Sequence, residues 1–330
     1  MIISAPIFEA YLKCPSKCWQ FCLGEKGEEN VYSDFIRMQD NAYRTAGLER
    51  LMVKFQGGEH VALPSAPVDI KTASWRLAIG IVAKKESLES HLHAVEQLPS
   101  HGQDKPVQFI PIRFVFANKL TKSDKLLLTF DALVLSEMIG REITHGKIIH
   151  GNGYAAFKVK TSVLTGEVRK LTGKIVKMLK DKLPPDLILN RHCPECKYQD
   201  RCRQKAIEKD DLSLLTGMAE KERKKLNSKG IFTVTQLSYT FRPRRRSKWQ
   251  RDKREKYHYS LKALAIREKK IYIVGNPELK IEGTPIYLDV EGLPDRDFYY
   301  LIGLRIRNGE SIVQHSLWAN STEDEEAIWR

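Results

Sequence analysis

Six cysteines in two widely separated groups constrain this sequence more than any other feature. The first residues lack the basic, apolar and small-residue regions of an export signal, so we expect a cytoplasmic chain, where disulfides are rare. The second group has a C-x2-C-x5-C spacing, which is typical of ligands to a metal ion or an iron-sulfur cluster. The two groups are Cys14, Cys18 and Cys22, and Cys193, Cys196 and Cys202.

A thiolate site of this kind takes four ligands, so the second group needs a fourth residue from elsewhere. Cys14, in CPSKCW, is the natural source, and its use would close a loop of about 180 residues. The spacing of the first group also fits a stripe of small apolar residues on one helix face. The residues alone leave both interpretations of the first group open.

Half of the formal charge of +14 lies in one segment of fifteen residues. The sequence RPRRRSKWQRDKREK, residues 242–256, holds nine basic and two acidic residues. Such a cluster attracts polyanions, and the neighbouring aromatic side chains can stack on unpaired bases, although a solvated linker has the same composition. The candidate nucleic-acid contacts here are Arg244, Arg245, Arg246, Lys248 and Arg251.

Hydrophobic periodicity and turn residues predict an α/β fold in residues 1 to about 205. Residues 211–241 favour three short helices separated at Gly217 and Gly230, and KKIYIV, residues 269–274, favours a short strand. Residues 286–319 favour three consecutive strands. In the first 205 residues we expect helices at 7–22, 43–55, 125–140 and 167–183, a strand at 106–116 and a hairpin at 147–160.

Asp289 and Glu291 are the pair of acids in the chain whose spacing most clearly indicates a chemical role. They lie two residues apart in the predicted strand IYLDVEG, so both side chains leave the same face of the sheet. Paired carboxylates on one face suit a divalent metal ion. The alternative is a pair of solvated acids on an edge strand.

The early CP element, joined across a nuclease-sized segment to the cysteine tail, resembles RecB-type nucleases with an iron-sulfur cluster, including those associated with CRISPR systems. The predicted element order also resembles their restriction-endonuclease fold of the PD-(D/E)xK type. The resemblance implies a four-iron four-sulfur cluster on Cys14, Cys193, Cys196 and Cys202, with Cys18 as the competing fourth ligand. Tetrahedral zinc is the alternative, because it takes the same thiolates.

Active members of that family hold Mg²⁺ with strand carboxylates and orient the attacking water with a lysine. The corresponding strand here reads FIPIRF, in which Ile110 and Pro111 stand where an acid is needed and Arg113 is a basic remnant. Glu96, in LHAVEQL, is the one surviving carboxylate. We therefore expect the front domain to be a binding scaffold that has lost its chemistry.

The segment around Asp289 resembles the opening of an RNase H-like, DnaQ-type exonuclease domain of the YprB type. That family begins with Asp-x-Glu, followed by a strand with Tyr-x-x-Gly, which matches residues 300–303. The resemblance implies that Asp289 and Glu291 bind Mg²⁺ or Mn²⁺ for phosphodiester hydrolysis. It also implies later aspartates, and the sequence ends at Arg330, so we expect an incomplete catalytic set and a poorly packed end.

Residues 211–241 also resemble helix-hairpin-helix modules. Together, these segments cover essentially the whole chain and resemble a family of RecB-like nucleases with a C-terminal YprB-type domain. They imply metal-dependent processing of DNA or RNA, with a helicase or other DNA-processing protein as partner and no membrane. The alternative is a non-catalytic nucleic-acid-binding or adaptor protein. The predicted segments are a nuclease domain at 1–205, a helical spacer at 206–241, a basic linker at 242–283 and an RNase H-like part at 284–330.

Overall fold

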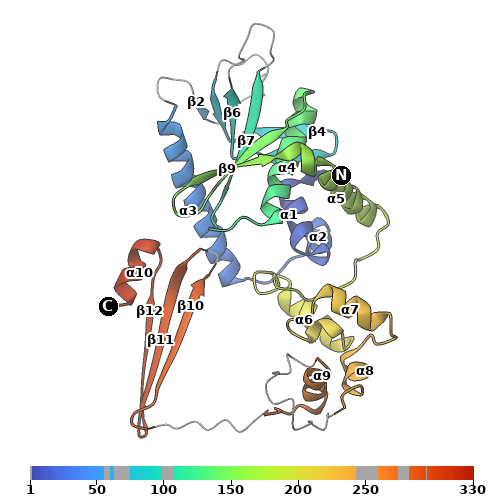
Figure 1. The fold of residues 1–330 in the computed structure, drawn as a ribbon, viewed down its shortest axis with the longest axis vertical. Helices are drawn as coiled ribbons and strands as arrows, with labels where there is room; N and C mark the ends of the chain where they lie inside the picture. Colours follow the sequence, from blue (N-terminus) through green and yellow to red (C-terminus); the bar gives the residue numbers. More distant parts are fainter. Residues whose placement is uncertain are drawn as a thin grey trace, which may run out of the picture. The chain divides into compact units, whose positions relative to one another are not determined.

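The protein is a mixed α/β structure (Figure 1). Our computed structural model describes residues 2–55, 60–62, 75–98, 107–242, 259–273, 282–294 and 296–330. The chain divides into two compact units, each assembled from segments that are distant in sequence. Unit 1 contains residues 1–12, 35–181 and 279–330, and unit 2 contains residues 13–34 and 182–278.

The helices vary in length from one short turn to more than twenty residues. They are α1 (Ala5–Lys13), α2 (Pro15–Cys22), α3 (Val31–Val53), α4 (Lys122–Ile139), α5 (Thr161–Lys180), α6 (Gln199–Glu208), η1 (Leu212–Leu214), α7 (Glu220–Asn227), α8 (Val234–Ser238), α9 (Tyr259–Glu268) and α10 (Thr322–Ile328). Among the described helices, none is both long and apolar enough to cross a membrane.

A six-stranded mixed sheet forms the centre of unit 1, in the order β2-β3-β6-β7-β8-β9. The β2·β3 and β7·β8 pairs are parallel and the others are antiparallel. Its strands are β2 (His60–Ala62), β3 (Leu77–Ile79), β6 (Ala94–Leu98), β7 (Gln108–Val115), β8 (His145–His150) and β9 (Ala155–Lys160). A smaller sheet has the order β1-β5-β4, with β1 (Ile3–Ser4), β5 (Leu88–His91) and β4 (Val82–Lys85).

Helix α4 is surrounded by other elements, which explains its nearly continuous apolar sequence. It contacts β4, β5, β7, β8 and α5, and every residue from 126 to 135 is buried. A helix that is apolar on all sides needs such neighbours. A capping box between Thr121 and Asp124 starts the helix, and Gly140, with a φ of 69°, ends it. The predicted helix and its stop are confirmed.

Alternation along β7 gives the central sheet two packed faces. Ile112 and Phe114 lie in one buried cluster with Tyr43 of α3, while Val115 packs with Leu128 of α4 in another. In Figure 1, α3 and α4 accordingly run on different sides of these strands. The predicted strand and the predicted hairpin are confirmed, because β7 covers the former and β8 with β9 forms the latter.

The strands β10 (Ile286–Leu293), β11 (Phe298–Asn308) and β12 (Ser311–Trp318) form a separate antiparallel sheet in unit 1. Its side chains at alternate positions form what we name the apolar face of this sheet. Ile286 and Leu288 on that face are 62% and 63% exposed, and all of β12 is exposed. The three predicted strands and their poor packing are confirmed. The apolar face comprises Ile286, Leu288, Val290, Ile302, Leu304, Ile306, Val313 and Leu317.

Unit 2 is mainly helical. A buried cluster joins η1, α8 and α9, and its members are Leu212, Leu215, Val234, Leu237 and Ala263. Gly217 and Gly230 have φ values of 85° and 78°, in the left-handed region that glycine enters without strain. Thr233 caps α8 through its side chain. The predicted short helical elements between residues 211 and 241 are confirmed.

Three expectations about the chain's local structure and segmentation differ from the structure. The predicted helix at 7–22 is broken at Cys14, whose backbone is extended because Pro15 follows it and begins α2. Residues 269–273 form no strand, since they follow the end of α9, a helix that the sequence analysis missed. The predicted segment boundaries also differ from the two units, because residues 13–34 pack with residues 182–278.

Candidate functional site

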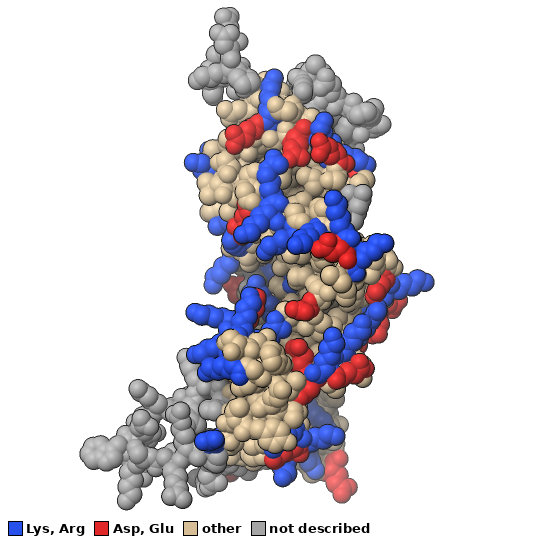
Figure 2. Space-filling model, turned by 90° about the vertical axis from the view of Figure 1, so that its right-hand side faces the viewer, with Lys and Arg blue, Asp and Glu red and all other residues tan. Residues whose placement is uncertain are grey.

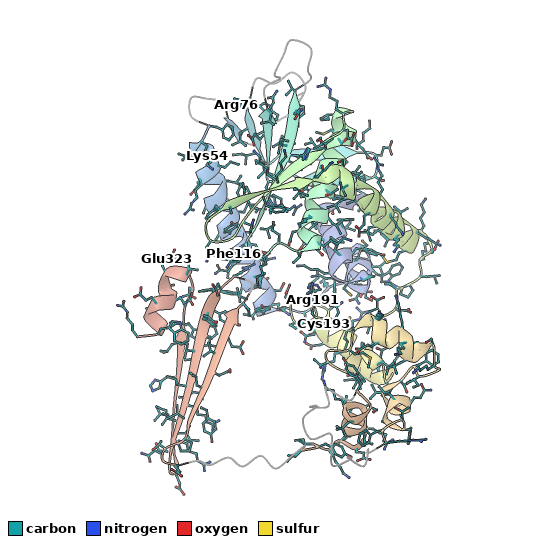
Figure 3. All side chains as sticks on the ribbon, viewed as in Figure 1. Lys54, Arg76, Phe116, Arg191, Cys193 and Glu323 are labelled. Carbon is teal, nitrogen blue, oxygen red and sulfur yellow. The ribbon has the colours of Figure 1, made fainter. Side chains whose placement is uncertain are left out.

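Four cysteines line one pocket of unit 2, which we name the cysteine pocket. Cys14 is the N-cap residue of α2, Cys193 and Cys196 lie in a turn-rich segment, and Cys202 lies in α6. The backbone N–H of Cys196 donates to the carbonyl of Cys193, which folds the C-x2-C segment tightly. Figure 3 shows Cys193 and the neighbouring Arg191 just ahead of α6. All six cysteines in the chain are free thiols.

The thiols of the cysteine pocket raise one another's pKa values electrostatically. Burial raises the pKa of Cys193, and the proximity of Cys14, Cys196 and Cys202 raises it further. Burial likewise raises the pKa of Cys202, with added contributions from Cys196 and Cys14. Thiols held this close are costly to ionise together unless a cation lies among them, since a cation favours the thiolate form.

Two hydrogen bonds point at sulfur atoms in this pocket. The backbone N–H of Asn190 donates to Cys193 Sγ at 3.2 Å, and Gln20 Nε2 donates to Cys202 Sγ at 3.6 Å. Donors of this kind stabilise thiolate ligands and tune the group that they hold. Gln20 Oε1 is buried and has no hydrogen-bond partner within the described part of the chain.

Cys18 and Cys22 lie apart from this set. Cys18 is fully buried, and neither residue lines the cysteine pocket. Burial raises the pKa of Cys18 most, and the proximity of Cys22, its hydrogen bond and the proximity of Cys14 raise it further. The structure therefore brings Cys14, rather than Cys18, together with the tail cysteines. The helix-stripe interpretation does not hold for Cys14, because it precedes α2 instead of lying on its face.

The four thiols of the cysteine pocket do not form a closed coordination sphere in this structure. Over the described ranges, no three or more His, Cys, Asp or Glu side chains are placed to hold a metal ion together. A thiolate site commonly closes only around its metal, because binding and local folding are coupled. The donor set still decides the chemistry, since four thiolates select an iron-sulfur cluster or zinc over hard cations such as Mg²⁺.

Glu96 and Arg113, the remnants predicted for the RecB-type centre, are both held in ion pairs of unit 1. Glu96 lies on β6 and pairs with Lys147 of β8. Arg113 lies on β7 and forms two hydrogen bonds to buried Asp131 of α4, at 2.8 and 2.9 Å. Their partners lie on separate sides of the sheet, since Glu96 shares the Ile112 face and Arg113 the Val115 face.

Asp289 and Glu291 lie on β10, where alternation places both on the face opposite the apolar face. Asp289 is opposite Gly303 in the neighbouring strand, and Glu291 is opposite Leu301. Both acids are exposed. Gly303 and Leu301 have no oxygen-bearing side chain, so these two directly opposite positions of β11 supply no third ligand.

The basic candidates Arg244, Arg245, Arg246, Lys248 and Arg251 lie outside the described residues. Basic side chains are nevertheless common elsewhere on the molecule. Figure 2 draws one face, on which Lys and Arg in blue are more abundant than Asp and Glu in red.

Several residues of these sites were missed by the sequence analysis. Gln20 and Asn190 contact the sulfur atoms, and His192 lines the cysteine pocket. His192 directly precedes Cys193, so its position in the sequence was an available signal. Burial lowers the pKa of His192, and Arg191 lowers it further, which keeps the ring neutral near pH 7. Lys147 and Asp131 carried no sequence signal, because each is defined by a distant partner.

No protein-family model matches this chain, and no curated protein matches it.

Proposed function

We propose that the chain is a nucleic-acid-binding protein of the RecB-like nuclease type, in which Cys14, Cys193, Cys196 and Cys202 hold a metal centre. The cysteine pocket carries the proposal, because it gathers thiols from the two ends of a loop of about 180 residues. An all-thiolate set with N–H donors to sulfur suits a four-iron four-sulfur cluster, with zinc as the alternative. The bound group would supply a cross-link that fixes residues 13–34 against residues 182–278.

The nucleic-acid assignment is supported by the net charge of +14 and by the family resemblance of the motifs. An α/β core with a mixed central sheet agrees with a RecB-like domain, and the three-stranded β10–β12 sheet agrees with the start of an RNase H-like domain. The α7–α8 pair, with its Gly230 turn, agrees with a helix-hairpin-helix module. These resemblances make DNA or RNA the ligand class that we propose.

The charged side chains argue against hydrolysis in the core of unit 1. Glu96 is paired with Lys147, so it is not free to hold Mg²⁺, and Arg113 is committed to Asp131, so it is not free to orient an attacking water. Asp289 and Glu291 remain the acids that would bind Mg²⁺ or Mn²⁺. Two carboxylates alone leave too few ligands to fix two metals and an attacking water. We therefore propose binding without efficient cleavage by this chain alone.

The metal centre is tested by purifying the intact chain without oxygen and measuring iron, zinc and the absorption spectrum. We expect iron and a broad band near about 400 nm that Cys196→Ser removes, since iron-sulfur thiolates give charge-transfer absorption. Cys22→Ser is the matched control, because Cys22 lies outside the cysteine pocket. Stoichiometric zinc would refute the cluster and keep the four-cysteine site, whereas the absence of both metals would refute the site.

The catalytic part is tested with end-labelled single-stranded and duplex DNA and RNA in Mg²⁺ and in Mn²⁺. We expect binding with little or no cleavage. Robust cleavage that Asp289→Asn abolishes would place an active centre on the β10–β12 sheet. Robust cleavage that vanishes in Glu96→Gln but persists in Asp289→Asn would restore the core of unit 1 as a nuclease and overturn the proposal.

A further inference from the structure

Unit 2 contains a second pocket, formed by α2, α6, α7 and the segments beside them, which we name the α6–α7 pocket. It adjoins the cysteine pocket, since Ser16 and Leu187 line both. Its cavity volume is about 430 Å³, within the range of about 300 to 1,000 Å³ that small-ligand sites occupy.

Cationic side chains reach this pocket from two helices. Lys205 of α6 and Lys209 just after it are four residues apart, so they follow the same side of the helix. Neither forms an ion pair with any residue that the structure describes. Arg223 lines the pocket from α7, and its Nε atom is buried without a hydrogen-bond partner among the described residues. A phosphate oxygen would supply the missing acceptor.

The acidic residues of the same pocket do not cancel these cations. Glu25 forms an ion pair with Arg201, and an oxygen of Asp211 accepts the backbone N–H of Ser213 at 2.7 Å. Asp186 is the remaining acid of the lining. The lining therefore holds four cations, Arg201, Lys205, Lys209 and Arg223, against three carboxylates, so its net charge is +1. Three of these cations have no ion-pair partner among the described residues and remain available to an anionic ligand.

Two aromatic rings complete the pocket. Trp19 reaches it from α2, and Phe232 reaches it from the turn between α7 and α8. Phe232 is 56% exposed, so its ring is accessible to a ligand in the pocket. Aromatic faces next to phosphate-binding cations are the combination that binds single-stranded nucleic acid, because every base can stack on a ring.

We propose that the α6–α7 pocket binds one nucleotide unit of a single-stranded nucleic acid. Arg223, Lys205 and Lys209 contact its phosphate, and Phe232 stacks with the base. The proposal rests on the proposed nucleic-acid function, but it assigns the contact to the described residues of unit 2 rather than to the basic segment at 242–256.

The test measures binding of a fluorescent oligothymidylate of about ten nucleotides to the intact chain by anisotropy, over a range of salt concentrations. Lys205→Gln, Lys209→Gln and Arg223→Gln should each weaken binding and reduce the log–log salt slope, and the triple variant should reduce the slope by about 0.7, the value for one phosphate of a single strand. Phe232→Ala should weaken binding about fivefold or more with an unchanged slope. Lys221→Gln, an exposed charge of the same helix α7, is the control.

Arg223→Lys guards against loss of folding, since it keeps the charge and should bind more tightly than Arg223→Gln. Wild-type binding that none of the pocket variants changes would overturn this inference and leave the proposed function standing. No binding by the wild type would instead remove the proposed function itself. If polyglutamate competed with the oligonucleotide as strongly as an unlabelled oligonucleotide does, and Phe232→Ala bound with wild-type affinity, the binding would be general attraction of polyanions. That result would also overturn the inference. Competition by thymidine monophosphate as strong as by the oligomer would assign the pocket to a free nucleotide instead.

Discussion

The buried ion pair between Arg113 and Asp131 is the most informative place to perturb unit 1. Asp131 accepts two hydrogen bonds from the Arg113 guanidinium and one from Ser90 Oγ at 2.5 Å. The side chains of Arg113 and Asp131 are only 11% and 2% exposed. Removing either charge leaves the other in a nearly dry site, so the two single variants should be far more damaging than the loss of both.

The expected magnitudes follow from this burial. Arg113→Met should lower the free energy of unfolding by about 3 to 5 kcal/mol, because it leaves the Asp131 carboxylate without its counter-charge. Asp131→Leu should be similarly costly, because it leaves the guanidinium unpaired. The double variant should be more stable than either single variant, since apolar side chains often replace a buried ion pair at little cost. The coupling energy should therefore exceed about 2 kcal/mol.

Hydrogen exchange measured by mass spectrometry on the intact chain gives the local readout. The slowest amides of β7 and α4 should lose about a hundredfold or more of protection in each single variant and regain much of it in the double variant. The matched control is Lys122→Met, which breaks the exposed pair with Glu167 and should cost less than about 1 kcal/mol. Additive effects of the two single variants would refute this account of the pair.

Two further predictions concern pH and surface. Burial lowers the pKa of His93, and Arg113 and Arg44 lower it further. Below about pH 6.5 the His93 side chain is therefore protonated in the unfolded chain but stays neutral in the folded chain. Urea titrations should show stability falling by up to about 1.4 kcal/mol per pH unit below that point, and His93→Gln should flatten the fall; an identical profile would contradict this. Leu288→Thr on the apolar face should reduce binding of the dye ANS, whereas Val163→Thr on α5 should not; equal dye binding in both would argue against an exposed apolar face.

Local sequence signals predicted much of the fold. The glycine at position 140, the hairpin around residues 151–154 and the Asp-x-Glu strand all depend on short-range chemistry, and the structure has the corresponding elements. The break at Cys14 was also available locally, because Pro15 disfavours helix at the preceding residue. The apolar periodicity of residues 7–22 continues across this proline, so it predicts one helix where two exist.

The ion pairs and the grouping into units depend on distant partners. The sequence suggested Glu96 as a metal ligand because its ion-pair partner, Lys147, lies 51 residues later. The pairing of β6, β7 and β8 brings the two side chains together, and the sequence around Glu96 does not show this. The α6–α7 pocket likewise draws Trp19, Lys205 and Arg223 from three helices. No window of sequence contains such a set, so the sequence analysis did not identify the pocket.

The division of unit 2 into an early and a late segment has a consequence for biosynthesis. A ribosome that adds about 5 to 20 residues per second needs about 10 to 40 seconds to pass from the codon of Cys14 to that of Cys193. The central sheet of unit 1 is made within this interval, so it can fold before the cysteine pocket has its full set of thiols. The metal centre that we propose would therefore assemble only after Cys193, Cys196 and Cys202 have been added to the chain.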